Sequence, residues 1–139
     1  SKMKKINYYY FVAGFLAILF SITHELNGQQ VLLPALYTGE LDITTVTTFK
    51  YIWHIITAEN FVFGIMFIIM AFYKKQEQVR FAAWLICVIL LIRLFVIVIT
   101  TLMMGGKMDN LGIDIIAIIV YTTIILLGTR AGNRIKVNG

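Results

Sequence analysis

Four polar residues interrupt an apolar stretch that begins near residue 51 and continues to Phe72. Ionisable groups at membrane depth cost about 2.5 to 3.5 kcal/mol each on insertion scales, so they usually face a protein interior or a water-filled cavity. A histidine and a carboxylate in such a stretch can bind a polar ligand or relay a proton. The four residues, His54, Thr57, Glu59 and Asn60, are therefore the first candidates for a functional site.

Two residues further along the chain extend this candidate ligand-binding or proton-relay site. Arg93 can anchor an anion, and Tyr121 shares a helix face with Asp114. At a rise of 1.5 Å per residue, Glu59 and Arg93 both lie about 15 Å from the outer membrane boundary. We expect them to form an ion pair, because each charge then offsets the insertion cost of the other.

Two imidazoles and two carboxylates form a second candidate set, for a metal ion. Such side chains suit zinc, iron or manganese. No pair of them has a metal-ligand spacing within one segment, and the positive charge of Arg93 opposes a cation. A divalent metal is the cofactor that the set predicts, and haem held by both histidines is the less favoured alternative. The set consists of His24, Glu25, His54 and Asp114.

The composition places these residues in a membrane. The chain has 139 residues, of which 60% are hydrophobic, and its mean hydropathy is +0.86. Soluble domains average about 45 to 50% apolar residues. Four segments reach the length of about 20 residues that crosses a bilayer. They are residues 6–26, 49–73, 79–104 and 111–129.

The segments predict an all-α integral membrane protein. Lipid offers the backbone no hydrogen bonds, so spanning segments of this length form helices, and the alternation of β-barrel strands is absent. The connections after the second and third segments are short, which is typical of antiparallel neighbours. We therefore expect four transmembrane helices in an antiparallel bundle, forming one domain over residues 1–139.

The basic residues predict the orientation of this bundle. Nine Lys and Arg residues lie at the termini and in the second connection, against two in the other connections: Lys2, Lys4, Lys5, Lys74, Lys75, Arg80, Arg130, Arg134 and Lys136 against Lys50 and Lys107. The positive-inside rule places both termini in the cytoplasm. The net charge of +5 occurs in short clusters, so it indicates topology and no nucleic-acid partner. We expect a bacterial cytoplasmic (inner) membrane protein.

The first connection, over residues 27–48, is predicted to be a longer extracytoplasmic loop. It contains an apolar piece, residues 31–37, with the only proline, Pro34. Such a piece is too apolar for water. We expect a short interfacial helix that covers the outer polar residues as a lid, and the alternative is a helix that rests on the lipid headgroups.

These features leave several functions open. No serine or cysteine nucleophile is paired with a base at a recognisable spacing, so no catalytic residues are predicted and an enzyme is not favoured. Binding of a small ligand or metal ion is the first hypothesis. The alternatives are a non-catalytic accessory or assembly subunit of a larger membrane complex, and a proton-coupled transporter that acts as an oligomer. The predicted partners are the bilayer, and a second copy or a larger membrane protein.

Overall fold

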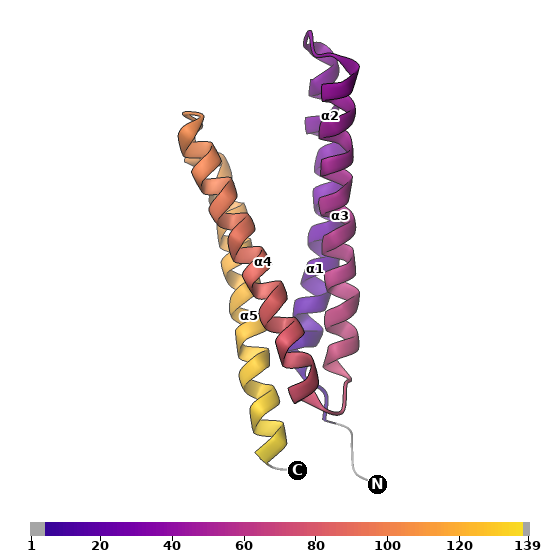
Figure 1. Ribbon diagram of the computed structural model, residues 1–139, viewed down its shortest axis with the longest axis vertical. Helices are drawn as coiled ribbons and strands as arrows, with labels where there is room; N and C mark the ends of the chain where they lie inside the picture. The colour runs from indigo at the N-terminus through magenta and orange to yellow at the C-terminus, as the bar shows by residue number, and fades with distance from the viewer. Residues whose placement is uncertain (1–4, 138–139) are drawn as a thin grey trace. The chain divides into compact units, whose positions relative to one another are not determined.

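The computed structural model describes residues 5–137 and contains only helices, turns and loops over that range (Figure 1). Four helical segments are long and apolar enough to cross a membrane: Tyr8–Thr38, Ile43–Ala71, Gln76–Met103 and Gly112–Asn133. At 1.5 Å per residue even the shortest is about 33 Å long, and a bilayer has a hydrocarbon core of about 30 Å. The predicted all-α, membrane-embedded class is confirmed.

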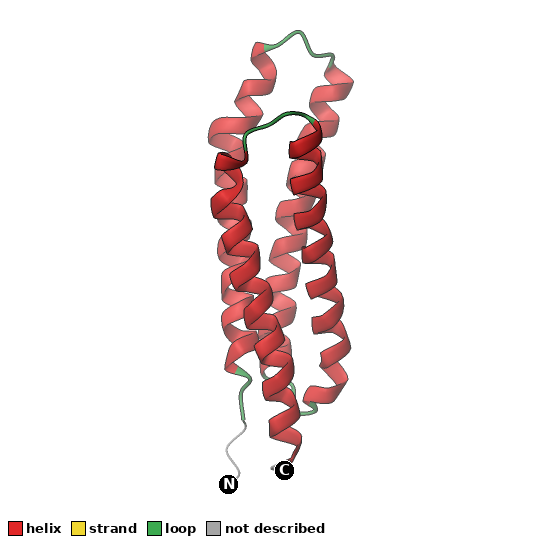
Figure 2. Cartoon of the chain, turned by 90° about the vertical axis from the view of Figure 1, so that its left-hand side faces the viewer, coloured by secondary structure: helices red, strands yellow, loops and turns green. Residues whose placement is uncertain are grey.

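The chain divides into two compact units. One contains Ser1–Ala13 and Phe67–Gly139, and the other contains Gly14–Met66. The helices are α1 (Tyr8–Asn27), α3 (Ile43–Ala71), α4 (Gln76–Met103) and α5 (Gly112–Val137), with shorter pieces between them. Figure 2 shows that short loops join the helices. The antiparallel bundle of four helices and the single domain over residues 1–139 stay predictions.

The predicted long first connection is wrong. The only residues outside helices in this region are 39–42, and α3 begins at Ile43. The apolar residues 31–37 are the end of a continuous helical rod, which leaves the expected lid without a segment to form it. The rod continues beyond α1 through a π-helix (Gly28–Leu32), α2 (Leu33–Ala35) and a 3-10 turn (Leu36–Thr38).

Pro34 accounts for the widened turn in this rod. Proline has no backbone N–H, and its ring clashes with the carbonyl four residues earlier in a regular α-helix. Here the N–H of Leu33 bonds to the carbonyl of Gly28, five residues back, which is the π-helical pattern. Pro34 then occupies the first turn of α2, where a missing donor costs little. The helix therefore passes through the proline instead of ending there.

Two of the turns are fixed by capping contacts. The carboxylate of Asp42 accepts a hydrogen bond of 2.9 Å from the N–H of Thr45 at the start of α3. Hydrogen bonds from the side chain and backbone of Thr45 hold the pKa of Asp42 below its usual value. After α4, Gly105 has a φ of 68°, and the N–H of Gly106 bonds to the carbonyl of Thr101 at 2.9 Å. The short connection predicted after the third segment is confirmed.

Within residues 14–66, α1 and α3 pack through small residues. A Cβ atom at Gly64 would lie 2.8 Å from the carbonyl oxygen of Gly14 and 2.6 Å from Cγ1 of Ile18. The hydroxyl of Ser21 donates to the carbonyl of Thr57 at 2.9 Å. Small residues let membrane helices approach this closely. Small residues of both helices therefore form the contact between α1 and α3.

A buried polar network joins four segments of the other unit. Nδ2 of Asn7 donates to Oε1 of Gln76 and to the carbonyl of Gly128, both at 2.9 Å. Nε2 of Gln76 donates to the carbonyls of Met70 at 2.8 Å and Tyr73 at 2.7 Å. Both amides are buried, and each finds acceptors within the chain. The network ties the start of the described chain to the ends of α3 and α5 and the start of α4.

Large apolar side chains cover the outward faces of the helices. The exposed fraction reaches 64% for Phe15, 79% for Phe81 and 83% for Ile113. Apolar surface on this scale is unfavourable in water and has lipid as its natural solvent. The apolar side chains on the surface and the length of the apolar helices therefore both indicate a membrane environment.

We predict that replacing Gly64 by alanine loosens the packing of α1 on α3. The new methyl group would meet the backbone of Gly14, and overpacking of this kind costs about 1 to 3 kcal/mol. Unfolding in detergent, followed by circular dichroism, measures the loss. Gly112→Ala is the matched control, because a Cβ there meets nothing within 4 Å. Equal stability of the two variants would contradict the close packing.

Candidate functional site

A carboxylate of α1 and an imidazole of α3 meet within residues 14–66. Nδ1 of His54 lies 2.9 Å from Oε1 and 3.1 Å from Oε2 of Glu25. The bond from Ser21 to the carbonyl of Thr57 fixes the register of the two helices one turn away. Glu25 and His54 belong to the metal-ligand set expected from the sequence, and the structure brings these two together.

Two further side chains hold the carboxylate of Glu25. Oγ1 of Thr57 donates to Oε2 at 2.7 Å, and Nε2 of Gln29 donates to Oε1 at 3.0 Å. Both carboxylate oxygens are thus engaged in hydrogen bonds, with His54 as the third partner. A carboxylate held on several sides has one orientation, so it can fix the ring of His54 in turn. Thr57, predicted as a ligand-binding residue, serves here to position Glu25.

The contact with Glu25 determines which nitrogen of His54 can react. A carboxylate beside Nδ1 favours the form that carries its proton on Nδ1, and the lone pair is then on Nε2. No described residue hydrogen-bonds Nε2, and 43% of the His54 side chain is exposed. The arrangement therefore presents a basic nitrogen at the surface of the helix pair. Such a nitrogen can accept a hydrogen bond, take up a proton or act as a general base.

His24 has a different environment. Its ring stacks on Trp53, with centroids 4.0 Å apart and planes 9° from parallel. Nε1 of Trp53 donates to the backbone carbonyl of His24 at 3.0 Å. Gly28 makes room for the indole, since a Cβ there would lie 2.1 Å from Nε1 of Trp53. His24 is therefore a packing partner of Trp53, while His54 pairs with Glu25.

The predicted metal set gains no support from this geometry. Among the residues whose side chains are described, no group of three or more His, Cys, Asp and Glu side chains could share a metal ion. Asp114 belongs to the other unit, and the two histidines have separate partners. The four-ligand metal site stays a prediction, and the structure shows only the pair of Glu25 with His54. The stacking of His24 on Trp53 likewise gives no support to haem.

The remaining predicted residues lie in two places. Glu59 and Asn60 follow Thr57 on α3, in the same unit as the pair. Arg93 of α4 and Tyr121 of α5 belong to the other unit, where the charge of Arg93 acts on the buried phenol of Tyr121. Tyr121 also packs edge-on against Phe67, with ring centroids 6.2 Å apart. The ion pair of Glu59 with Arg93 stays a prediction, because these residues belong to different units.

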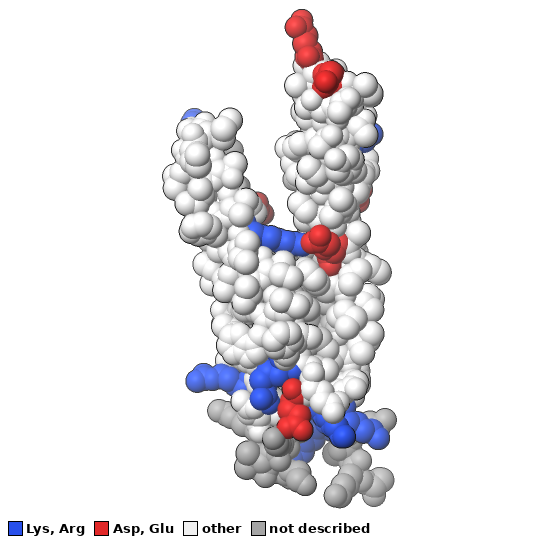
Figure 3. Space-filling model, viewed as in Figure 1, with Lys and Arg blue, Asp and Glu red and all other residues white. Residues whose placement is uncertain are grey.

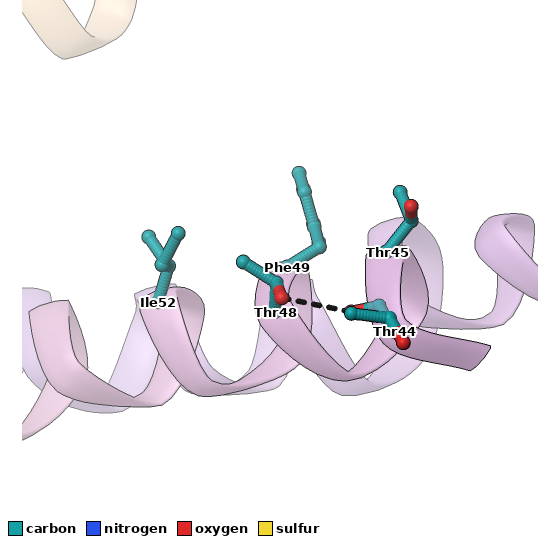
Figure 4. Close-up of a pocket in the computed structure, with 5 residues that line it drawn as sticks. All are labelled: Thr44, Thr45, Thr48, Phe49 and Ile52. Carbon is teal, nitrogen blue, oxygen red and sulfur yellow. Dashed lines mark hydrogen bonds between the residues drawn. The ribbon is translucent and has the colours of Figure 1, made fainter. Parts of the chain in front are cut away.

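A shallow depression on the first turns of α3 offers little for a polar ligand (Figure 4). It has a volume of about 300 Å³, and its lining is mostly apolar. The hydroxyl of Thr48 is directed back to the carbonyl of Thr44 at 2.8 Å. The depression therefore does not compete with the Glu25 and His54 pair as a site. Its lining residues are Thr44, Thr45, Thr48, Phe49 and Ile52.

The sequence analysis missed the partners that position the pair. Gln29 lies four residues after Glu25, so their contact could have been found from helical spacing alone. The bond from Ser21 to Thr57 and the stacking of His24 on Trp53 join different helices. They depend on the register of α1 against α3, for which the sequence carries no direct signal.

The chain matches no family model, no curated protein and no solved structure.

We predict that diethyl pyrocarbonate modifies His54 in preference to His24. The reagent attacks an accessible imidazole nitrogen. The side chain of His54 is 43% exposed, whereas Nε2 of His24 is buried beside Trp53. Peptide mass spectrometry of the folded protein in detergent measures both sites, and denatured protein gives the reference rates. Equal protection of the two histidines in the folded state would contradict this geometry.

Proposed function

We propose that this chain is a small multi-pass membrane protein that binds a small polar ligand at His54, with Glu25 and Thr57 as positioning residues. The observation that carries the proposal is the 2.9 Å contact between Nδ1 of His54 and Glu25, which directs the lone pair of the ring to Nε2. The ligand class that fits is one with a hydrogen-bond donor, an O–H or N–H group, for that nitrogen.

The position of the pair along its helix supports access from water. His54 lies 17 residues before the end of α3 at Ala71, which is about 26 Å along the helix. A hydrocarbon core about 30 Å thick that begins near Ala71 would therefore have His54 close to its far boundary. A polar ligand can reach that depth without crossing the apolar centre. The same depth lowers the local dielectric, which strengthens the hydrogen bonds of the site.

We further propose a bacterial inner membrane with both termini cytoplasmic, and the charge distribution supports this orientation. In the unit that contains α4 and α5, basic side chains gather at the connection between α3 and α4 (Figure 3). In the other unit, Lys50 is the only Lys or Arg residue, and two acids, Glu40 and Asp42, lie at the loop between α1 and α3. The positive-inside rule assigns the basic end to the cytoplasm, so the His54 site opens outward.

Cysteine labelling in intact cells tests this orientation. Thr38→Cys should react with a membrane-impermeant maleimide from outside, and Lys75→Cys should react only after permeabilisation. Both positions are exposed, and the native Cys87 is buried, so it gives little background. A reversed pattern would place the proposed site on the cytoplasmic side and remove the argument for outside access.

The bound ligand can be sought directly in purified protein. We predict that the wild type and His24→Gln carry a stoichiometric small molecule after mild detergent extraction, and that His54→Gln has lost it at least tenfold. Loss of a hydrogen bond to a polarised imidazole, about 1.5 to 3 kcal/mol, corresponds to such a factor. Mass spectrometry of the denatured extracts measures the occupancy. Circular dichroism shows that each variant is folded.

The alternatives give different results in the same preparation. A larger membrane protein that co-purifies equally with wild type and His54→Gln, with no small molecule, would favour the accessory subunit. Proton transport by the ligand-free protein in vesicles would favour the proton-coupled transporter, provided that His54→Gln abolishes the transport. Either result would overturn ligand binding as the function of the site.

A further inference from the structure

Arg80 lies on the buried face of α4. The buried residues of this helix include Gln76, Ala83, Cys87 and Leu90, and Arg80 follows Gln76 by four positions and precedes Ala83 by three. Residues three and four apart share one face of a helix. Arg80 therefore lies on the same face of α4 as these buried residues. The neighbouring positions on this face hold small or apolar residues and the amide of Gln76, which has hydrogen-bond acceptors within the chain.

The guanidinium of Arg80 has donors without acceptors. Its Nε and Nη2 atoms are buried, and no described residue accepts a hydrogen bond from either. A lipid-facing arginine extends its whole guanidinium towards water, which would expose these atoms. Arg80 instead keeps them within the protein. Because guanidinium stays charged, burial of its donors without an acceptor is unfavourable.

The surroundings of these donors are defined by contacts of the same unit. Gln76 of α4 faces Gly132 of α5, since a Cβ at Gly132 would lie 3.3 Å from Cβ of Gln76. Arg80 comes four residues after Gln76 on α4, and Gly128 comes four residues before Gly132 on α5. Because the two helices run in opposite directions, this register places Arg80 level with Gly128. The ring of Tyr10 packs on Gly128, and the charge of Arg80 acts on the phenol of Tyr10. The guanidinium thus lies near the start of α4, within electrostatic range of the phenol of Tyr10.

Further positive charge surrounds this end. Lys74 and Lys75 directly precede α4, and Arg130 follows Gly128 by two residues; all three side chains are exposed. Figure 3 shows the basic side chains gathered there. Glu77, the acid of the first turn of α4, supplies one negative charge and has interactions of its own. Positive charge exceeds negative at this end.

We propose that Arg80 is the central ligand of a phosphate site, which takes the phosphate of an anionic lipid headgroup or a free phosphate. The fork of Nε and Nη2 matches two phosphate oxygens, and the flanking lysines and Arg130 supply the field that attracts the anion. Basic pockets between transmembrane helices at the cytoplasmic face bind anionic headgroups in this way. This site is independent of His54.

Thermal unfolding of the full chain in dodecyl maltoside tests the proposal with named probes. Phosphatidylglycerol should raise the Tm of the wild type, and zwitterionic phosphatidylcholine should leave it unchanged. Arg80→Gln should need about tenfold more phosphatidylglycerol for the same shift, because a charge-assisted hydrogen bond is lost. Lys107→Gln, which removes one positive charge at the opposite end of α4, should respond like the wild type. Arg80→Lys keeps the charge without the fork and should give an intermediate response.

Inorganic phosphate separates the two sources of the anion. Stabilisation by phosphate that depends on Arg80, without an effect of phosphatidylglycerol, supports the phosphate site and assigns it to a soluble ligand. If Arg80→Gln fails to fold, spin-labelled phosphatidylglycerol and phosphatidylcholine can be compared on the wild type alone. The comparison measures which of the two lipids associates more strongly with the protein. Equal association of the two lipids together with no effect of phosphate overturns the proposal. An equal response of wild type and Arg80→Gln overturns it as well.

Discussion

The structure depends on one constraint, which is that polar groups among lipid-facing helices must find partners within the chain. The amide of Asn7 meets it with Gln76 and the carbonyl of Gly128. The hydroxyl of Thr122 satisfies this constraint within its own helix, because it donates a hydrogen bond to the carbonyl of Ile118. Lipid cannot replace such partners, so each polar side chain restricts how its helix can pack. A few side chains thereby set the arrangement of long apolar helices.

Glu25 and Arg80 respond to this constraint in opposite ways. Glu25 is surrounded by donors, so its role is to hold other groups, above all the ring of His54. Arg80 has buried donors for which the described chain supplies no acceptor. A satisfied group belongs to the scaffold, whereas a buried group with unused bonding capacity points to chemistry outside the chain. The same comparison separates Nδ1 of His54, which is held, from its Nε2, which is not.

The sequence predicted the helices well, because hydropathy and length decide them. It also predicted the short connection after the third segment, where Gly105 adopts a positive φ. It failed at the first connection, where a widened turn before Pro34 lets the helix continue. The helical rod therefore extends to Thr38.

The candidate site could be predicted only in part. His54, Glu25 and Thr57 were all expected to matter, but they were divided between a metal set and a ligand set. Their actual grouping depends on the register between α1 and α3, which hydrogen bonds across the helices fix. Arg80 was used only as one of the nine basic residues that predict the orientation of the helices in the membrane. Its position on the buried face of α4 becomes visible once the neighbouring buried residues are known.

The π-helix at Gly28–Leu32 also changes how substitutions beyond it must be interpreted. A turn that holds one extra residue rotates everything after it by about 100° relative to a regular helix. A helical wheel drawn from α1 at constant pitch therefore assigns the wrong face to Leu33, which is in fact buried. Loss of one residue in this turn would return it to a regular α-helix and would leave the residues beyond it on the faces they now occupy. One further inserted residue would instead rotate the end of the rod by about 100°, so this turn should accept a deletion more readily than an insertion.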